Sequence, residues 1–208
     1  MDPPPGWLDA AADLPELKKR PLLLRWIAQH PKASAHLRAR LMGRLPWRAL
    51  SAVAADPAAH PQARQQATEK LQQLWPGLTT GERRSLALHA PRPLWSLIWR
   101  APVASVLEAF LQHPRLGLDS LLALIQPPLR SVQVEALATS RWRETGPVAE
   151  QVLQALDRSL PLPDSGLVLG HAAPWIRAMD EETRILVAGR ILTPALRRMV
   201  HPRRGDQD

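Results

Sequence analysis

Apolar residues recur at helical spacing along most of the chain. Val103, Val106, Leu107, Phe110 and Leu111 fall at positions i, i+3, i+4, i+7 and i+8, which form one stripe on a helix. No segment alternates apolar and polar residues over enough positions for a strand, and β-branched residues are sparse. The pattern therefore predicts an all-α protein.

A short phrase is repeated along the chain. It reads LRWIAQHP at 24–31, is echoed 26 positions later as LSAVAADP at 50–57, and returns as LEAFLQHP at 107–114. Each copy is an apolar helical turn, then a polar residue, then a proline that ends the helix. Repeats with such a period indicate helical units that stack, because none can bury its apolar face alone.

The 22 prolines are scattered, so they divide the chain into short helices. We expect helices over 22–29, 33–44, 47–55, 62–74, 79–90, 93–100, 103–111, 118–125, 129–139 and 145–158. Thr79 and Glu82 have the spacing of a capping box. Asp180 is expected to cap a helix that ends near Leu192, and a last short helix begins at Pro194.

The domain organisation follows from these segments. We expect an acidic, proline-rich lead-in over 1–20, flexible or loosely docked, and a helical-repeat body over 21–158. Helices in 159–200 continue or cap that body, and 201–208 is a flexible tail. The longest non-helical stretch, 159–166, is the best candidate for a hinge.

One copy of the phrase carries a family resemblance. Residues 52–64 (AVAADPAAHPQAR) resemble the bacterial leucine-rich repeat variant, a HEAT-like pattern of short helix, polar residue with proline, second proline and longer helix. The other two copies lack the second proline. The resemblance implies a short right-handed α-solenoid whose extended concave face binds a partner. It implies no catalytic residue, and the cysteines of that family's iron–sulfur cluster have no counterpart here.

The net charge of +8 is concentrated near the start of the chain. Residues 1–16 carry four acids and no Lys or Arg, whereas residues 17–55 carry nine Lys or Arg and no acid. Like charges on one helix repel, so this basic segment must be relieved by the rest of the fold, by solvent or by an anionic partner.

Two interpretations of the basic segment stay open. It forms a solvated face that the acids of the lead-in (Asp9, Asp13 and Glu16) partly neutralise, or it contacts nucleic acid or an acidic protein. His36, Arg40 and Arg44 make one stripe on the helix 33–44. The candidate contact residues of this segment are Lys32, His36, Arg38, Arg40, Arg44 and Arg48.

Aromatic and histidine residues receive mostly structural interpretations. The eight tryptophans are expected to fill the core of the repeats, and Trp142, on a turn between Arg141 and Arg143, is the one most expected to be exposed. These three residues complete the candidate contact set. His30 and His113 precede turn prolines, where we expect them to meet free carbonyls at helix C-termini.

Several chemistries have no sequence signal. The chain has no Cys, which excludes disulfides, thiolate metal sites and cysteine nucleophiles. A phosphate-binding loop, a nucleophile elbow and histidines at metal-ligand spacing are also missing. We therefore expect no enzyme activity, no cofactor, no metal and no membrane partner. We expect a cytoplasmic location in a bacterial-type cell, since the N-terminus does not have the pattern of a signal peptide.

Three functions remain compatible with the sequence. The first is a non-enzymatic interaction module that binds a protein partner. The second is a nucleic-acid-binding HEAT-like protein that uses segment 17–55, with a DNA glycosylase-like enzyme as a minor subtype. That subtype needs a carboxylate near an exposed tryptophan, and the nearest acid after Trp95 and Trp99 is Glu108. The third is an accessory subunit whose terminal repeats are covered by neighbours.

Overall fold

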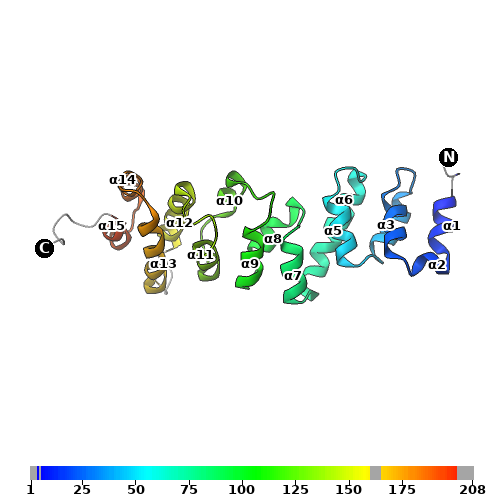
Figure 1. The fold of residues 1–208 in the computed structure, drawn as a ribbon, viewed down its shortest axis with the longest axis horizontal. Helices are drawn as coiled ribbons and strands as arrows, with labels where there is room; N and C mark the ends of the chain where they lie inside the picture. The colour runs from blue at the N-terminus through cyan, green and yellow to red at the C-terminus, as the bar shows by residue number, and fades with distance from the viewer. Residues whose placement is uncertain (1–3, 5, 160–164, 201–208) are drawn as a thin grey trace. The chain divides into compact units, whose positions relative to one another are not determined.

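The chain folds into helices joined by short turns (Figure 1). The structure, a computed structural model, describes residues 4, 6–159 and 165–200. Within these ranges it contains no strand, which confirms the predicted all-α class. Two compact units are present, Met1–Ile98 (unit 1) and Trp99–Asp208 (unit 2). The predicted helical body over 21–158 therefore includes residues of both units.

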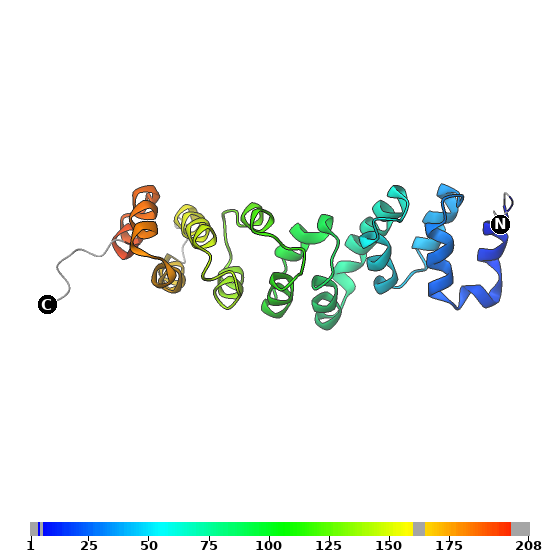
Figure 2. The ribbon, with the colours of Figure 1, turned by 45° about the horizontal axis from the view of Figure 1, so that its top comes forward.

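Unit 1 is built from consecutive short helices. Each packs on the next ones along the chain: α3 on α4 and α5, and α6 on α4 and α5, as the blue and cyan segments of Figure 2 show. The core side chains include Leu24, Leu37, Leu50 and Leu71, all buried. The elements are α1 (Trp7–Asp13), α2 (Pro15–Lys18), α3 (Pro21–Gln29), α4 (Ala35–Met42), α5 (Trp47–Ala55), α6 (Pro61–Leu74), η1 (Trp75–Gly77), α7 (Thr80–Ala87), η2 (Arg92–Leu94) and α8 (Trp95–Trp99), whose last residue belongs to unit 2.

The beginning of the chain, expected to be a flexible or loosely docked lead-in, is helical over most of residues 7–18. Leu8, Ala11 and Ala12 are buried, and their spacing of i, i+3 and i+4 forms the inner stripe of α1. Both α1 and α2 contact α3. The prolines and acids of this segment favoured a non-helical interpretation of the sequence, so its apolar stripe was not recognised.

The repeated phrase has a common turn geometry. The residue before the proline accepts the backbone N–H of the residue after it: His30 Nδ1 at 3.2 Å, Asp56 Oδ1 at 2.9 Å and His113 Nδ1 at 3.1 Å. His60 does the same before Pro61, at 3.2 Å. Pro has no N–H of its own, and the N–H after it lies in a turn or, for Gln62, in the first turn of α6, so it has no intrahelical carbonyl to bond. His30, His60 and His113 thus each accept a backbone N–H through Nδ1.

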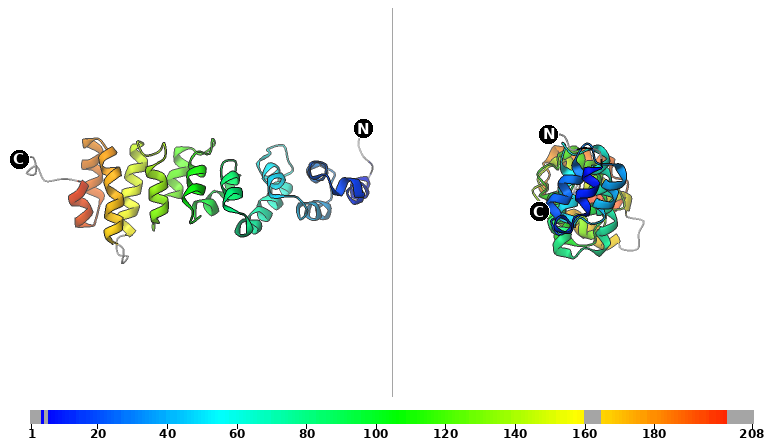
Figure 3. Two further views of the ribbon diagram at one scale, coloured as in Figure 1. Left: turned by 60° about the horizontal axis from the view of Figure 1, so that its bottom comes forward. Right: turned by 90° about the vertical axis from the view of Figure 1, so that its right-hand side faces the viewer.

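Unit 2 continues in the same way. In the left view of Figure 3 its helices stand side by side, and α9 packs on α11, α11 on α13, and α12 on both α13 and α14. The apolar stripes predicted for α9 and α12 are buried, among them Leu107, Phe110, Val152 and Leu156. The elements are α9 (Ala104–Leu111), α10 (Leu118–Leu124), α11 (Ser131–Ala138), α12 (Gly146–Ser159), α13 (Ser165–Ala178), α14 (Glu181–Arg190) and α15 (Pro194–Val200).

The helix α13 was not predicted. It contains Gly170 and Pro174, which are poor residues for a helix interior. Its inner face carries Ala172, Trp175 and Ile176, all buried. α13 packs on α11, α12 and α15, and burial of its inner face outweighs the local preference of the backbone. Of the hinge expected over 159–166, residues 160–164 lie outside the described ranges, as does the expected tail 201–208.

A buried carboxylate ties the end of α12 to the start of α15. Asp157 accepts the backbone N–H groups of Leu192 and Thr193, both at 2.8 Å. Burial raises the pKa of Asp157, but these two N–H donors, the Thr193 side chain and the charge of Arg197 outweigh it, so the pKa lies below its ordinary value. The carboxylate is therefore held in its charged form and anchors the loop before α15.

Candidate interaction surface

The basic segment 17–55 does not form one continuous exposed face, and Arg38 is the clearest departure. Its side chain is only 4% exposed. The guanidinium donates from Nη2 to the carbonyls of His30 (3.2 Å) and Pro31 (3.0 Å), and from Nη1 to Gln62 Oε1 (3.3 Å). Burial lowers the pKa of Arg38. Arg38, a predicted contact residue, is therefore not offered at the surface of unit 1: its donors close the turn before α4 and join that turn to α6.

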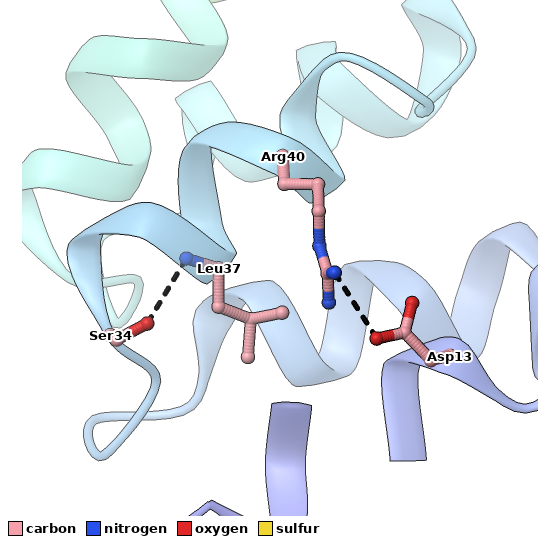
Figure 4. A network of polar contacts seen from close by, with 4 residues as sticks. All are labelled: Asp13, Ser34, Leu37 and Arg40. Atoms are coloured by element: carbon pink, nitrogen blue, oxygen red, sulfur yellow. Dashed lines mark hydrogen bonds and ion pairs between the residues drawn. The ribbon is translucent and has the colours of Figure 1, made fainter. Parts of the chain in front are cut away.

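Arg40 forms the ion pair that the sequence suggested with the acidic lead-in. Figure 4 shows its side chain reaching from α4 toward Asp13 at the end of α1, with 3.1 Å between Nη1 and Oδ2. The same view shows Ser34 accepting the Leu37 N–H at 3.1 Å, the cap that starts α4. Arg40 is thus partly neutralised from within unit 1.

Four predicted contact residues remain at the surface of unit 1: Lys32, His36, Arg44 and Arg48 are exposed. The guanidinium carbon of Arg48 lies 5.3 Å from the centre of the Trp47 ring. Trp47 in turn donates its indole N–H to Glu82 Oε1 at 3.0 Å, which ties α5 to α7. Of the predicted contact residues of unit 1, some are therefore engaged in contacts within the fold and others are exposed to solvent.

Glu82 combines this bond with the predicted capping box. Its Oε2 accepts the Thr79 N–H at 2.9 Å, and the Thr79 hydroxyl accepts the Glu82 N–H at 3.3 Å. The bond from the Thr79 N–H is the main cause that lowers the pKa of Glu82. The prediction of a capping box at the start of α7 is confirmed.

Arg141, Trp142 and Arg143 belong to unit 2. Trp142 is half-buried: its indole N–H donates to the carbonyl of Leu111 at 3.2 Å, and the guanidinium carbon of Arg141 lies 4.8 Å from the centre of its ring. The prediction that Trp142 is the exposed tryptophan is therefore wrong. The turn between α11 and α12 is held against α9 by this bond, while the two arginines are exposed.

The most exposed tryptophan is instead on α3, at a position that the sequence interpretation placed in the core. Trp26 is 74% exposed and Leu22 is 73% exposed. They lie one helical turn apart on the side of α3 opposite to Leu24, Ile27 and Ala28, which are buried. We call Leu22 and Trp26 the α3 ridge. The signal was available, since apolar residues at i and i+4 lie outside the inner stripe of this helix.

Polar and charged side chains border the α3 ridge. Lys19 and Arg20 are exposed just before α3 begins. Arg25, on the flank of the helix, donates from Nε to Gln29 Oε1 at 3.4 Å, and Gln29 donates to Asp56 Oδ2 at 3.0 Å. An apolar centre with a polar, mainly cationic border is the usual anatomy of a protein interface.

Unit 2 has a hollow of about 400 Å³ between α9 and α11. Its charged groups are Glu108 and Arg141, and its hydroxyls donate to helix carbonyls, as Ser140 does to Leu137 at 2.7 Å. The hydroxyls are therefore committed to the helix end. The lining residues are Glu108, Leu111, Gln112, Ala136, Thr139, Ser140 and Arg141.

Among the described residues, no group of three or more His, Asp or Glu is placed to hold a metal ion. In the same ranges, no helix has both the length and the apolar character needed to cross a bilayer. Comparison with protein-family models, with curated proteins and with solved structures finds no match.

Proposed function

We propose that this protein is a non-enzymatic interaction module, a short right-handed α-solenoid of HEAT-like units, that binds a protein partner through the α3 ridge. The single observation that carries the proposal is the exposure of Leu22 (73%) and Trp26 (74%) one turn apart on α3. A large aromatic side chain left in water gains most from being covered, and tryptophan is enriched where interfaces derive their affinity.

The repeated turns support the helical-repeat part of the proposal. The phrases ending at Pro31, Pro57 and Pro114 each form the same kind of hydrogen bond, in which the N–H after the proline donates to the side chain before it. Successive helices of unit 1 pack on their neighbours along the chain, as do those of unit 2. Both features suit units that stack, and such proteins commonly offer extended surfaces for binding.

The distribution of the arginines favours a protein partner over nucleic acid. Nucleic-acid affinity depends on cations that are free to contact phosphates. Arg38 is buried against carbonyls, Arg40 pairs with Asp13, and Arg48 lies over Trp47. The basic segment thus offers fewer phosphate contacts than its nine Lys and Arg suggest.

The proposal is tested by affinity purification of the full chain from its native host. We compare wild type with Leu22→Ala/Trp26→Ala, which removes the α3 ridge and keeps helix-forming residues. The matched control is Ile185→Ala/Leu186→Ala, which removes exposed apolar side chains (53% and 57% exposed) from α14 in unit 2. We expect a partner that copurifies with wild type and the control and is lost with the ridge variant. A partner that the ridge variant retains would refute the proposal.

Nucleic-acid binding is checked in parallel by fluorescence anisotropy with labelled duplex and single-stranded DNA and RNA. We expect weak binding that disappears as the salt concentration rises, because few cations are available to the phosphates. Tight binding that is lost in Arg44→Glu/Arg48→Glu would assign the function to nucleic acid instead.

A further inference from the structure

We infer that the partner segment recognised by the α3 ridge is an acidic amphipathic helix. Its apolar residues lie one turn apart, and Asp or Glu residues flank them. This inference rests on the proposed function, whose docking site it shares, and it adds the chemistry of the partner. Three features of unit 1 carry it: the shape of the ridge, the sign of the charge around it, and the placement of the acids on the neighbouring helices.

The shape of the ridge suits a helix. Leu22 and Trp26 project from a nine-residue helix, with Gln29 following them on the same side. The apolar strip therefore runs along the axis of α3, and Leu23, 36% exposed, adds to its flank. A helix with apolar residues at i and i+4 or i+3 presents a strip of similar width, so the two can pack side by side.

The charge around the ridge selects an acidic partner. Lys19 and Arg20 are exposed where the chain enters α3, and Arg25 is held beside the ridge by its bond to Gln29. Between residues 17 and 55 the chain has no acid, and the acid that follows, Asp56, accepts a hydrogen bond from Gln29 at 3.0 Å. A second copy of the chain would bring the same cations against each other, and like charges across an interface oppose association. Asp and Glu on a partner helix would instead be attracted to this border.

The neighbouring helices oppose a flat anionic surface. Asp13, which pairs with Arg40, and Glu16 are exposed on α1 and α2, and both of these helices pack against α3. A bilayer is much wider than one helix, so it would meet these carboxylates as well as the cations. A partner helix contacts only a strip, so it can follow the ridge without covering α1 and α2.

The test is a display selection on the full chain with helical peptides of about 16 residues, roughly four turns. The peptides have fixed apolar residues at i, i+4 and i+7, and their flanking positions are randomised among Asp, Glu, Lys, Arg, Ser and Ala. Enriched peptides are then measured by anisotropy against wild type, Leu22→Ala/Trp26→Ala and Lys19→Glu/Arg20→Glu. The control for charge is Arg115→Glu/Arg143→Glu, which reverses two exposed cations on turns of unit 2.

We expect enrichment of peptides with a net negative charge. Their affinity falls by about 30-fold or more with Leu22→Ala/Trp26→Ala, as for loss of an aromatic anchor. It falls about tenfold with Lys19→Glu/Arg20→Glu, and this second loss shrinks at about 0.5 M salt, where exposed charges are screened. The Arg115→Glu/Arg143→Glu control changes affinity less than about twofold. Circular dichroism of each variant, and Leu22→Ala and Trp26→Ala tested singly, separate lost binding from lost folding.

The results that would contradict the acidic helix differ from those that would contradict the proposed function. Enrichment of neutral or basic peptides that still depend on Leu22 and Trp26 would overturn the acidic partner and leave the proposed function standing. Peptides that bind the ridge variant as well as wild type would overturn both. The absence of any enriched peptide would overturn the acidic helix. Self-association in sedimentation that is lost with Trp26→Ala, or ridge-dependent sedimentation with anionic vesicles, would assign the ridge to those occupants instead.

Discussion

Replacing Arg38 with Ala should destabilise unit 1 strongly, although the residue lies in a segment that looks like a charged surface. Arg38 donates three hydrogen bonds, two of them to carbonyls of the turn between α3 and α4. Hydrogen bonds of a charged donor contribute about 1.5–3 kcal/mol each, and the cost of burying the guanidinium offsets part of the sum. The buried aliphatic part of the side chain also packs in the core. We expect a loss of about 2–4 kcal/mol in the free energy of unfolding.

The measurement is urea unfolding followed by far-ultraviolet circular dichroism, with thermal unfolding alongside it. A loss of this size lowers the melting temperature by at least about 5 °C for a chain of this length. Arg38→Lys should fall between wild type and Arg38→Ala, because an ammonium keeps the charge but not the planar fork that reaches both carbonyls. In Arg38→Ala, amide hydrogen exchange should become faster in the turn at 30–34 by a larger factor than in α6.

The control is Arg44→Ala, which removes an exposed cation from the same segment. We expect it to change the stability by less than about 0.5 kcal/mol, as is usual for surface substitutions. If Arg38→Ala were as mild as Arg44→Ala, the three hydrogen bonds would not hold the turn and the reasoning would be refuted.

Three further substitutions test the remaining contacts. Trp142→Phe should lower the free energy of unfolding in urea by about 1 kcal/mol, because Phe has no N–H to donate and the Leu111 carbonyl on α9 loses its partner. Arg143→Ala should leave the free energy of unfolding unchanged. Asp157→Asn should remove the pH dependence that this carboxylate gives to the free energy of unfolding. Because the folded-state pKa of Asp157 is lowered, its stabilisation is complete above about pH 4 and is lost as the pH falls, so wild type and variant should converge in acid unfolding curves; a constant gap would contradict this. Asp13→Asn should cost less than about 1 kcal/mol, since its pair with Arg40 is exposed, and a larger loss in the melting curve would show that α1 depends on that pair.

Helix positions could be predicted wherever apolar spacing and proline agreed. The expected segments 22–29, 47–55 and 62–74 correspond to α3 (Pro21–Gln29), α5 (Trp47–Ala55) and α6 (Pro61–Leu74). Proline ends a helix through its own covalent geometry, so its effect can be read locally. The helices that were missed, α1, α2 and α13, contain proline, glycine or acids, and α1 and α13 are stabilised by burying Ala12 and Trp175.

The candidate surface was predicted less well, for a physical reason that Arg38 and Trp26 illustrate. In the sequence, the arginine belongs to a basic segment and the tryptophan to an apolar phrase. In the structure, the arginine is buried by the α3–α4 turn and α6, while the tryptophan points away from them. Burial depends on which neighbours cover a helix, and those neighbours are as far as 24 residues away in the chain.

By itself the sequence determined the all-α class, most helix boundaries, the capping box and the proline turns of the repeated phrase. These depend on interactions over a few residues, through backbone sterics and local hydrogen bonds. Only the tertiary structure decided which arginines are structural, that Trp142 is tied to α9, and that Leu22 and Trp26 face solvent. Those outcomes depend on packing between helices, because the same side chain is core or surface according to what lies against it.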